Sequence, residues 1–252
     1  MEQFTKRFRN TPIFGMIHLA GMNPVNQALE EIKIYETLGI DGVIIENYHG
    51  ELRDVKDTLN RLEFRSSSLE VGVNILPNEW SDAFVLAHEH NASFIQVDYV
   101  AGSYYAKKIV NSFLFDRMRN DYPRITVLGG VWPKYHEPVS GSNLNKDIYE
   151  GMKLVDAIVV TGEETGKETP IRKIKEFRRI IGNEYPLIIG DGLNFDNAFE
   201  QLMICDGAIV GSAFKPNNNR EEPNTKEPVD ASLVKRFMEI VYHVREEKIL
   251  MM

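Results

Sequence analysis

The chain has 252 residues, of which 43% are hydrophobic, 10% aromatic and 26% charged. Such a chain can bury a sizeable core, and its composition excludes disordered, collagen-like and disulfide-stapled proteins. The 37 acidic and 29 basic side chains give a formal net charge of -8. This charge argues against general binding to a nucleic acid, because clustered lysine and arginine supply that affinity.

Short apolar runs rich in isoleucine and valine recur along the chain, and each is followed by a longer amphipathic segment. This alternation is typical of βα units that build a parallel sheet. The predicted strands span residues 13–18, 42–46, 70–74, 94–98, 125–129, 157–161, 187–190 and 208–211.

The segments between these runs are predicted to be helical. The predicted helices span residues 25–38, 51–65, 80–90, 104–119, 146–155, 170–181, 195–203 and 231–247. In the first of them Ala28, Ile32 and Tyr35 recur at spacings of three and four, which gives one apolar face to pack on a sheet.

Eight strands in 252 residues give about 31 residues per unit, the size of a βα repeat, and no flexible linker divides the chain. We therefore expect a single domain over residues 1–252. Eight parallel strands can close into a barrel or stay open. The first loop, residues 20–24, lacks the Gly-x-Gly-x-x-Gly of an open dinucleotide fold. Together with the count of eight strands, this favours an α/β fold with a single (β/α)8 TIM barrel.

In a TIM barrel the carboxyl ends of all eight strands meet on one face, so polar residues at these ends converge. Polar residues or glycines follow each predicted strand. The predicted substrate-binding residues of this face are Asn47, Asn74, Gln96, Thr161 and Gly162.

The most specific signal is a pair of glycine-containing loops near the end of the chain. Gly190, Asp191 and Gly192 follow the seventh strand, and Gly211 and Ser212 follow the eighth. Glycines let a backbone approach an anion, and amides at a helix N-terminus donate hydrogen bonds to it. The simpler interpretation is a turn and a strand end. Because a phosphate bound by these two loops recurs in this fold, we predict a phosphate site.

A second group, Lys134 and His136, follows the glycine pair at the end of the fifth strand. A lysine and a histidine in this place could neutralise an oxyanion, form a Schiff base or move a proton. The alternative is a lid in which both side chains face water.

Carboxylates and a histidine end three other strands. Glu46, Asp98 and His18 each follow an apolar run, a setting that raises carboxylate pKa values and suits acid/base catalysis. Alternatively these side chains fasten loops by hydrogen bonds. No resident metal is predicted, because His-Glu-x-x-His and cysteine clusters are absent. Glu46, Asp98 and Asn74 could still hold a Mg2+ shared with a substrate phosphate.

Cys205 is the one cysteine of the chain and cannot form an internal disulfide. It lies near the end of the predicted seventh helix, away from the polar face, and no Gly-x-Ser-x-Gly motif is present, so nucleophilic serine or cysteine catalysis is not expected. No apolar run approaches the roughly 18 to 20 residues that span a bilayer. We expect a cytoplasmic protein without a transmembrane segment.

Taken in order, five segments resemble the BtpA family. They are residues 13–19 (IFGMIHL), 41–47 (DGVIIEN), 129–136 (GGVWPKYH), 156–162 (DAIVVTG) and 206–215 (DGAIVGSAFK). The resemblance implies a TIM barrel of the ribulose-phosphate-binding type. It implies less about activity, because the family is named for a protein of photosystem I biogenesis while other members resemble enzymes of sugar metabolism. The first loop lacks the family's Leu-Pro-Pro-Leu-Pro form, so no contact of that loop is carried over.

Two functions follow as hypotheses. The first is an enzyme that binds a small phosphorylated metabolite, a sugar or nucleoside phosphate, and acts on it by acid/base chemistry. The second is a non-catalytic assembly factor that binds a protein partner through an exposed apolar patch on the barrel exterior. Polar groups at every strand end favour the enzyme. We also expect a homo-oligomer that pairs through exterior helices.

Overall fold

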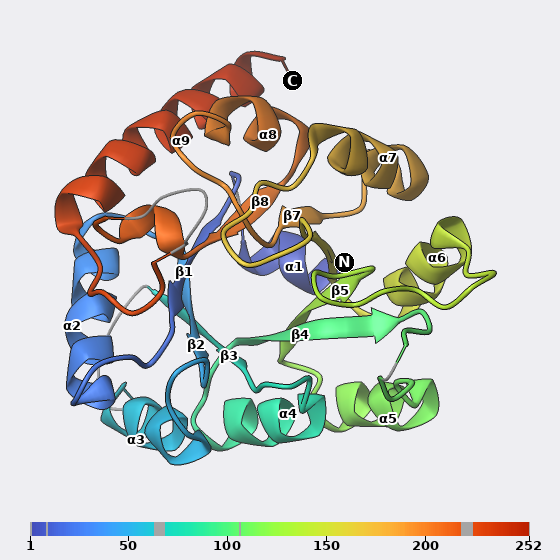
Figure 1. Cartoon of the computed structure of the whole chain (residues 1–252), viewed down its shortest axis with the longest axis horizontal. Coiled ribbons are helices and arrows are strands. Elements are labelled where there is room, and N and C mark those ends of the chain that lie inside the picture. The colour runs from blue at the N-terminus through green and yellow to red at the C-terminus, as the bar shows by residue number, and fades with distance from the viewer. Residues whose placement is uncertain (1, 9, 63–68, 106, 218–223, 252) are drawn as a thin grey trace.

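The eight apolar runs form eight parallel strands that close into a barrel in the order β1 to β8 (Figure 1). The computed structural model describes residues 2–8, 10–62, 69–105, 107–217 and 224–251. The strands are β1 Ile13–Ile17, β2 Gly42–Glu46, β3 Glu70–Asn74, β4 Phe94–Ala101, β5 Thr126–Val131, β6 Ala157–Val160, β7 Leu187–Ile189 and β8 Gly207–Val210. Pairing of Ile13 with Ala208 joins β1 to β8 and completes the ring. The fold is the predicted (β/α)8 TIM barrel.

Helices surround this ring (Figure 1). They are α2 Pro24–Thr37, α3 Leu52–Leu62, α4 Trp80–Glu89, α5 Ser112–Asp121, α6 Leu144–Leu154, α7 Ile171–Ile181, α8 Ala198–Ile204 and α9 Ala231–Met251, with a short 3-10 helix η1 Ser212–Phe214. The last residues of the helix predicted over 51–65 lie outside the described residues. Within the described ranges, no helix has the length and hydropathy needed to cross a membrane.

The prediction of a helix over residues 104–119 is wrong for its first half, because the helix begins only at Ser112. β4 continues to Ala101, and Tyr104 then forms an isolated bridge with Pro138. The Tyr104 hydroxyl also accepts a hydrogen bond from the amide of Trp132, 2.8 Å away. The helix begins only after Asn111, whose side chain accepts from the amide of Leu114 at 3.1 Å. Tertiary contacts and this N-cap therefore override the helical pattern of the preceding residues.

The apolar core has two layers, as alternation along the strands requires. Residues such as Ile13 and Ile17 face the helices, whereas Phe14 and Met16 face the barrel interior. The interior layer consists of Phe4, Phe8, Phe14, Met16, Ile44, Phe94, Leu128, Ala157, Val159, Ile188 and Ile209. Since the interior is filled with side chains, polar chemistry is confined to the ends of the barrel.

A short helix that the sequence analysis did not predict, α1 Glu2–Arg7, packs against the amino-terminal end of the barrel. The ring of Phe8, just beyond it, lies 4.8 Å from that of Phe14 and 5.4 Å from that of Phe94. Arg7 binds Glu70 at 3.1 Å, which ties the helix to the start of β3. Six residues are too few for a periodic signal, although Phe4 and Phe8 have helical spacing.

Replacing Phe8 with alanine should leave a cavity beneath the barrel core and lower the free energy of unfolding by about 3 to 5 kcal/mol. For a chain of this length the melting temperature should fall by roughly 6 to 20 °C. Urea unfolding and thermal melts measure both. Phe113→Ala is the control, because that ring is 75% exposed. Equal stability of the two variants would contradict the packing role of Phe8.

Candidate functional site

A small polar pocket lies at the carboxyl ends of the strands, where the topology predicts the site. Its cavity volume is about 40 Å³. The predicted site residues that line it are His18, Glu46, Gln96, Lys134, Gly190, Asp191, Gly211 and Ser212. Residues from β1, β2, β4, β7 and β8 and their loops thus meet in this mouth pocket, as parallel closure requires.

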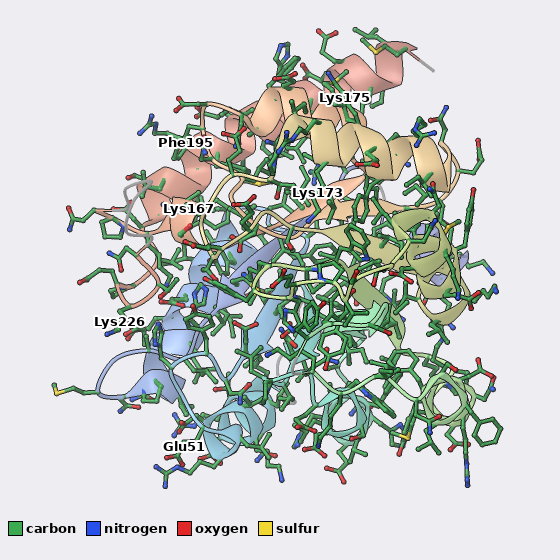
Figure 2. The ribbon with its side chains drawn as sticks, turned by 45° about the vertical axis from the view of Figure 1, so that its right-hand side comes forward. Glu51, Lys167, Lys173, Lys175, Phe195 and Lys226 are labelled. Atoms are coloured by element: carbon green, nitrogen blue, oxygen red, sulfur yellow. The ribbon has the colours of Figure 1, made fainter. Side chains whose placement is uncertain are left out.

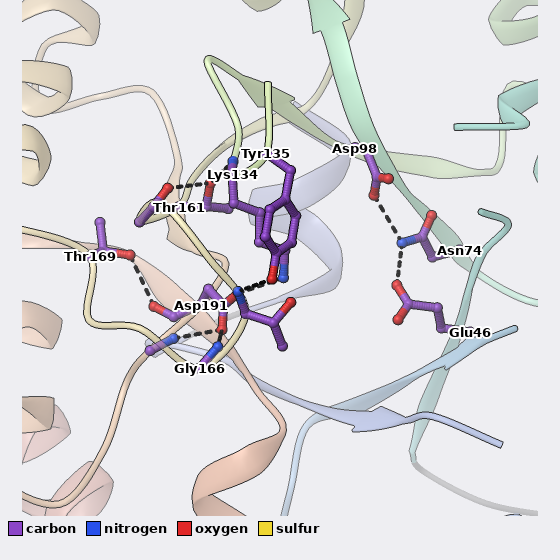
Figure 3. A network of polar contacts seen from close by, with 12 residues as sticks. Glu46, Asn74, Asp98, Lys134, Tyr135, Thr161, Gly166, Thr169 and Asp191 are labelled. Carbon is purple, nitrogen blue, oxygen red and sulfur yellow. Dashed lines mark hydrogen bonds and ion pairs between the residues drawn. The ribbon is translucent and has the colours of Figure 1, made fainter. Parts of the chain in front are cut away.

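One side of the mouth holds two carboxyl groups joined by an amide. Glu46 and Asn74 are paired in the register of β2 and β3, and Asp98 lies on β4. The Asn74 Nδ2 group donates to Glu46 Oε1 at 2.6 Å and to Asp98 Oδ1 at 3.2 Å (Figure 3). This bridge from β3 fixes the carboxyl groups of the two strands that flank it, β2 and β4.

Burial changes the protonation of this pair. Burial is the largest cause that raises the pKa of Glu46 to about 8, and the nearby charge of Asp98 is the second. Burial also raises the pKa of Asp98. Because desolvation disfavours the charged form, Glu46 retains its proton at neutral pH. The pair therefore offers a proton donor, Glu46, beside a second carboxyl group, an arrangement that suits acid/base catalysis.

The opposite side of the mouth holds an ion pair (Figure 3). Lys134 Nζ lies 2.5 Å from Asp191 Oδ2. Burial opposes the charge of this amine, but Asp191, Glu46 and Asp98 together raise the pKa of Lys134. The side chain is therefore a cation at neutral pH. Of the three roles considered for it, this state fits neutralisation of an oxyanion, because Schiff-base formation needs the free amine.

His18 lies in the mouth as a neutral ring. Burial, followed by the charges of Lys215 and His49, lowers the pKa of His18 well below its usual range. Its ring meets the edge of the Tyr48 ring at a centroid distance of 5.4 Å. A neutral imidazole has one donor and one acceptor nitrogen, so His18 is placed to exchange hydrogen bonds with a ligand.

His136 does not line the mouth pocket. Its Nδ1 atom lies 2.6 Å from the carbonyl oxygen of Lys134, and its ring packs on Tyr99 and Tyr104 at centroid distances of 5.0 and 5.5 Å. The ring thus orders the loop after β5. The geometry gives no support to the proton-transfer role considered for His136.

The glycine loop after β7 also differs from expectation. The amide of Gly190 donates to Val160 O at 2.8 Å, and that of Gly192 donates to Asp191 Oδ1 at 2.8 Å. The same carboxylate oxygen accepts from the amide of Gly166 at 2.7 Å. Gly190 and Gly192 therefore have no free amide for a phosphate, contrary to the prediction, and Asp191 supplies the anion that this loop binds.

Close packing explains the second glycine. Gly192 has φ of +70°, and a Cβ there would lie 1.9 Å from the carbonyl oxygen of Lys167. The loops after β6 and β7 are thus in contact, and Lys167 and Phe195 mark them in Figure 2. Only glycine fits this conformation and this approach.

A larger pocket of about 420 Å³ lies between the loops after β7 and β8. Leu193, Ser212 and Ala213 line it, and across the described part of the chain their amides have no hydrogen-bond acceptor. Ser212 lines both this rim pocket and the mouth pocket. The predicted Gly211–Ser212 segment thus remains available for an anion, with Leu193 and Ala213 as donors that the sequence analysis missed.

Lys215 lines the rim pocket, but its ammonium group already has partners within the protein. The side chain is fully buried, and its Nζ atom donates to Glu227 O at 2.6 Å. It also lies 3.6 Å from Glu31 Oε1 on α2. Anion binding in the rim pocket would consequently rest on backbone amides.

Three of the predicted substrate-binding residues are used by the protein itself. Asn47 exchanges two hydrogen bonds with the backbone of Leu76, at 2.8 and 3.3 Å. Thr161 Oγ1 accepts from the amide of Lys134 at 2.8 Å, which places that lysine. A Cβ at Gly162 would lie 2.9 Å from Glu168 O. These residues order the rim and do not line the mouth pocket.

The suggested Mg2+ site does not fit the geometry. Asn74 directs its amide nitrogen, which is no metal ligand, at Glu46 and Asp98. Within the described ranges, no group of three His, Cys, Asp or Glu residues could hold a metal ion.

Sequence reasoning missed three further polar residues of the mouth pocket, namely Tyr48, Thr165 and Thr225. Tyr48 and Thr165 lie within five positions of a strand end, so a wider window would have included them. Thr225 lies far beyond β8, and its Oγ1 atom is 2.8 Å from His49 Nε2. No local pattern predicts that contact.

The fold and this site define a TIM barrel with two carboxyl groups and a lysine ion pair at the carboxyl ends of its strands. The chain belongs to the BtpA family, whose model matches residues 9–243.

Two curated relatives illustrate the range of the family. An uncharacterized protein of Methanocaldococcus jannaschii is 28% identical, over 82% of this chain and 88% of that protein. The photosystem I biogenesis protein BtpA of Synechocystis is 23% identical, over 95% of this chain and 91% of that protein.

Among solved structures, the fold is similar to phosphoribosyl anthranilate isomerase from Thermus thermophilus, with a TM-score of 0.63 and 11% identity over 93% of this chain and all of that one. It is also similar to orotidine 5′-phosphate decarboxylase from Pyrococcus horikoshii, with a TM-score of 0.61 and 13% identity over 91% and 99% of the two chains. At such identities the likeness concerns the fold alone.

Proposed function

We propose that this protein is an enzyme that performs acid/base chemistry on a small phosphorylated metabolite. The observation that carries the proposal is a polar cluster in which Glu46 and Lys134 line the mouth pocket and Asn74 joins Glu46 to Asp98. Buried charges cost free energy unless they are paired, and such clusters gather where catalysis needs them. The phosphate-containing substrates in the names of two structural neighbours agree with the choice of ligand.

In this proposal the two ends of the substrate occupy different pockets. The phosphate would lie in the rim pocket, on the amides of Ser212 and Ala213 at the start of η1. The reacting end would enter the mouth pocket, since Ser212 lines both. There Glu46 holds the proton to be donated, Asp98 is the acceptor, and the Lys134 ammonium stabilises negative charge on a substrate oxygen.

The phosphate site has a direct test in two substitutions at one residue. Ser212→Asp should abolish the rise in melting temperature that inorganic phosphate gives the wild type, because a carboxylate at the rim repels the anion. Ser212→Ala should keep that rise, since the backbone amide is retained. With phosphate at ten times its Kd, the wild-type gain is about 1.4 kcal/mol, or roughly 3 to 5 °C. An unchanged response in Ser212→Asp, or none in the wild type, would contradict the site.

A second candidate function, binding of a protein partner, has one observation in its favour. Ile109 is 72% exposed, Phe113 75% and Leu114 45%, and the first two line a groove of about 530 Å³ beside α5. Contiguous apolar surface of this kind marks interaction sites. Phe113→Glu should weaken capture of such a partner and leave phosphate binding unchanged, which separates this function from the enzyme.

A further inference from the structure

Three buried polar atoms at the mouth have no partner. They are His18 Nδ1, Gln96 Oε1 and Thr165 Oγ1, and within the described ranges none forms a hydrogen bond. All three residues line the mouth pocket, although they come from β1, β4 and the loop after β6. Buried side-chain polar atoms are normally satisfied, so three in one pocket point to groups that a ligand supplies.

The chemistry of the three atoms defines that ligand. Gln96 Oε1 only accepts hydrogen bonds, whereas the Thr165 hydroxyl both donates and accepts them. The neutral His18 ring donates a hydrogen bond from one nitrogen and accepts one at the other. An anionic group would meet these acceptors unfavourably, and an apolar group would leave them unsatisfied. A hydroxyl group, which donates and accepts, matches all of them.

The size of the pocket restricts the ligand further. A cavity needs about 10 to 15 Å³ to hold one water molecule, so a cavity of about 40 Å³ admits about three non-hydrogen atoms and not a planar nucleobase. The rim pocket of about 420 Å³, which meets it at Ser212, has room for a phosphate and several carbon atoms.

We propose that the substrate is a sugar phosphate, and that His18, Gln96 and Thr165 bind the hydroxyl groups of its reacting end. This assignment rests on the proposed function, in which Ser212 and Ala213 bind the phosphate. It adds the class of carbon skeleton and the residues that select it.

Two nearly isosteric variants test the assignment, Gln96→Leu and Thr165→Val. Isothermal titration calorimetry measures the affinity of each variant and of the wild type for four compounds. They are inorganic phosphate, ribose 5-phosphate, ribulose 5-phosphate and uridine 5′-monophosphate. Each variant should bind the sugar phosphates about tenfold more weakly than the wild type does, because a substrate hydroxyl loses its partner. Binding of inorganic phosphate should be unchanged, and the wild type should prefer both sugar phosphates to the nucleotide.

The melting temperature without ligand distinguishes a ligand-binding role of Gln96 and Thr165 from a structural role. Removing an unsatisfied buried polar atom relieves its desolvation cost, so neither variant should melt below the wild type. Thr126→Val is the matched control at the opposite end of the barrel, where Thr126 Oγ1 accepts from Arg7 at 3.2 Å. It should melt lower and bind sugar phosphates as the wild type does.

Each other outcome has a distinct meaning. Sugar phosphates that bind the variants and the wild type equally would overturn the roles of Gln96 and Thr165, while the phosphate site stands. Tighter binding of uridine 5′-monophosphate would overturn the sugar assignment. Failure of every phosphate compound, inorganic phosphate included, to bind the wild type would overturn the proposed function itself.

Discussion

Glu46→Gln should stabilise the folded protein at pH 8 and abolish the proposed acid/base activity. The glutamine keeps an oxygen that accepts from Asn74, and it removes a carboxyl group whose ionisation burial opposes. The shift of the pKa from 4.5 to about 8 corresponds to about 3 to 5 kcal/mol at most. Thermal melts at pH 8 should show a rise of several degrees.

The sign of the pH dependence follows from the raised pKa of Glu46. Between about pH 4.5 and 8 the folded state holds a proton that the unfolded state has released. This contribution to stability is complete below about pH 4.5, declines as the pH rises and is lost above about pH 8. The decline should be much smaller in Glu46→Gln.

The control for this substitution is Glu70→Gln, at the other end of the neighbouring strand. Glu70 forms an ion pair with Arg7, so its replacement should not stabilise the protein. If the wild type and Glu46→Gln had identical pH profiles of stability, the pKa of Glu46 would not be raised in the folded state.

Lys134→Met should lower the free energy of unfolding by about 3 kcal/mol at pH 8 and abolish turnover. The substitution leaves Asp191 with no cation, and the Asp191 side chain is only 10% exposed. Removal of one member of a buried ion pair typically costs about 3 to 5 kcal/mol, and 29% exposure of Lys134 places the expected effect at the lower end. Urea unfolding measures the loss.

Asp191→Asn and the double variant complete a thermodynamic cycle for this pair. The double variant should be more stable than the sum of the two single losses predicts, because neither partner is left charged and alone. Additivity within about 0.5 kcal/mol would show that the two side chains do not interact.

The sequence predicts the strands of this fold well because six of the eight strands are buried along their whole length, on both faces. An Ile- and Val-rich run such as 157–160 has few alternatives to a central parallel strand. Once eight strands close, the ends of β2 and β4 must lie on one face, so Glu46 and Asp98 could be assigned to it before any coordinates were known. Their bridge through Asn74 depends on the pairing of β2 with β3.

Local sequence could not predict which polar groups remain free. The loop of Gly190 and Gly192 resembles an anion site, but the Asp191 side chain folds back onto the amides of Gly192 and Gly166. The latter lies 25 residues away, so tertiary packing decides the partner. The predicted role of His136 in the site is unsupported for the same reason, because its ring packs on the rings of Tyr99 and Tyr104 and not in the mouth pocket.

The phenylalanine-rich seal formed by α1 and Phe8 has a consequence for turnover. Among the described residues, side chains fill the amino-terminal end of the barrel, so the reactant and product of the proposed enzyme would both pass through the carboxyl face. Product that has not yet left would occupy the site of the next substrate molecule, so it should be a competitive inhibitor.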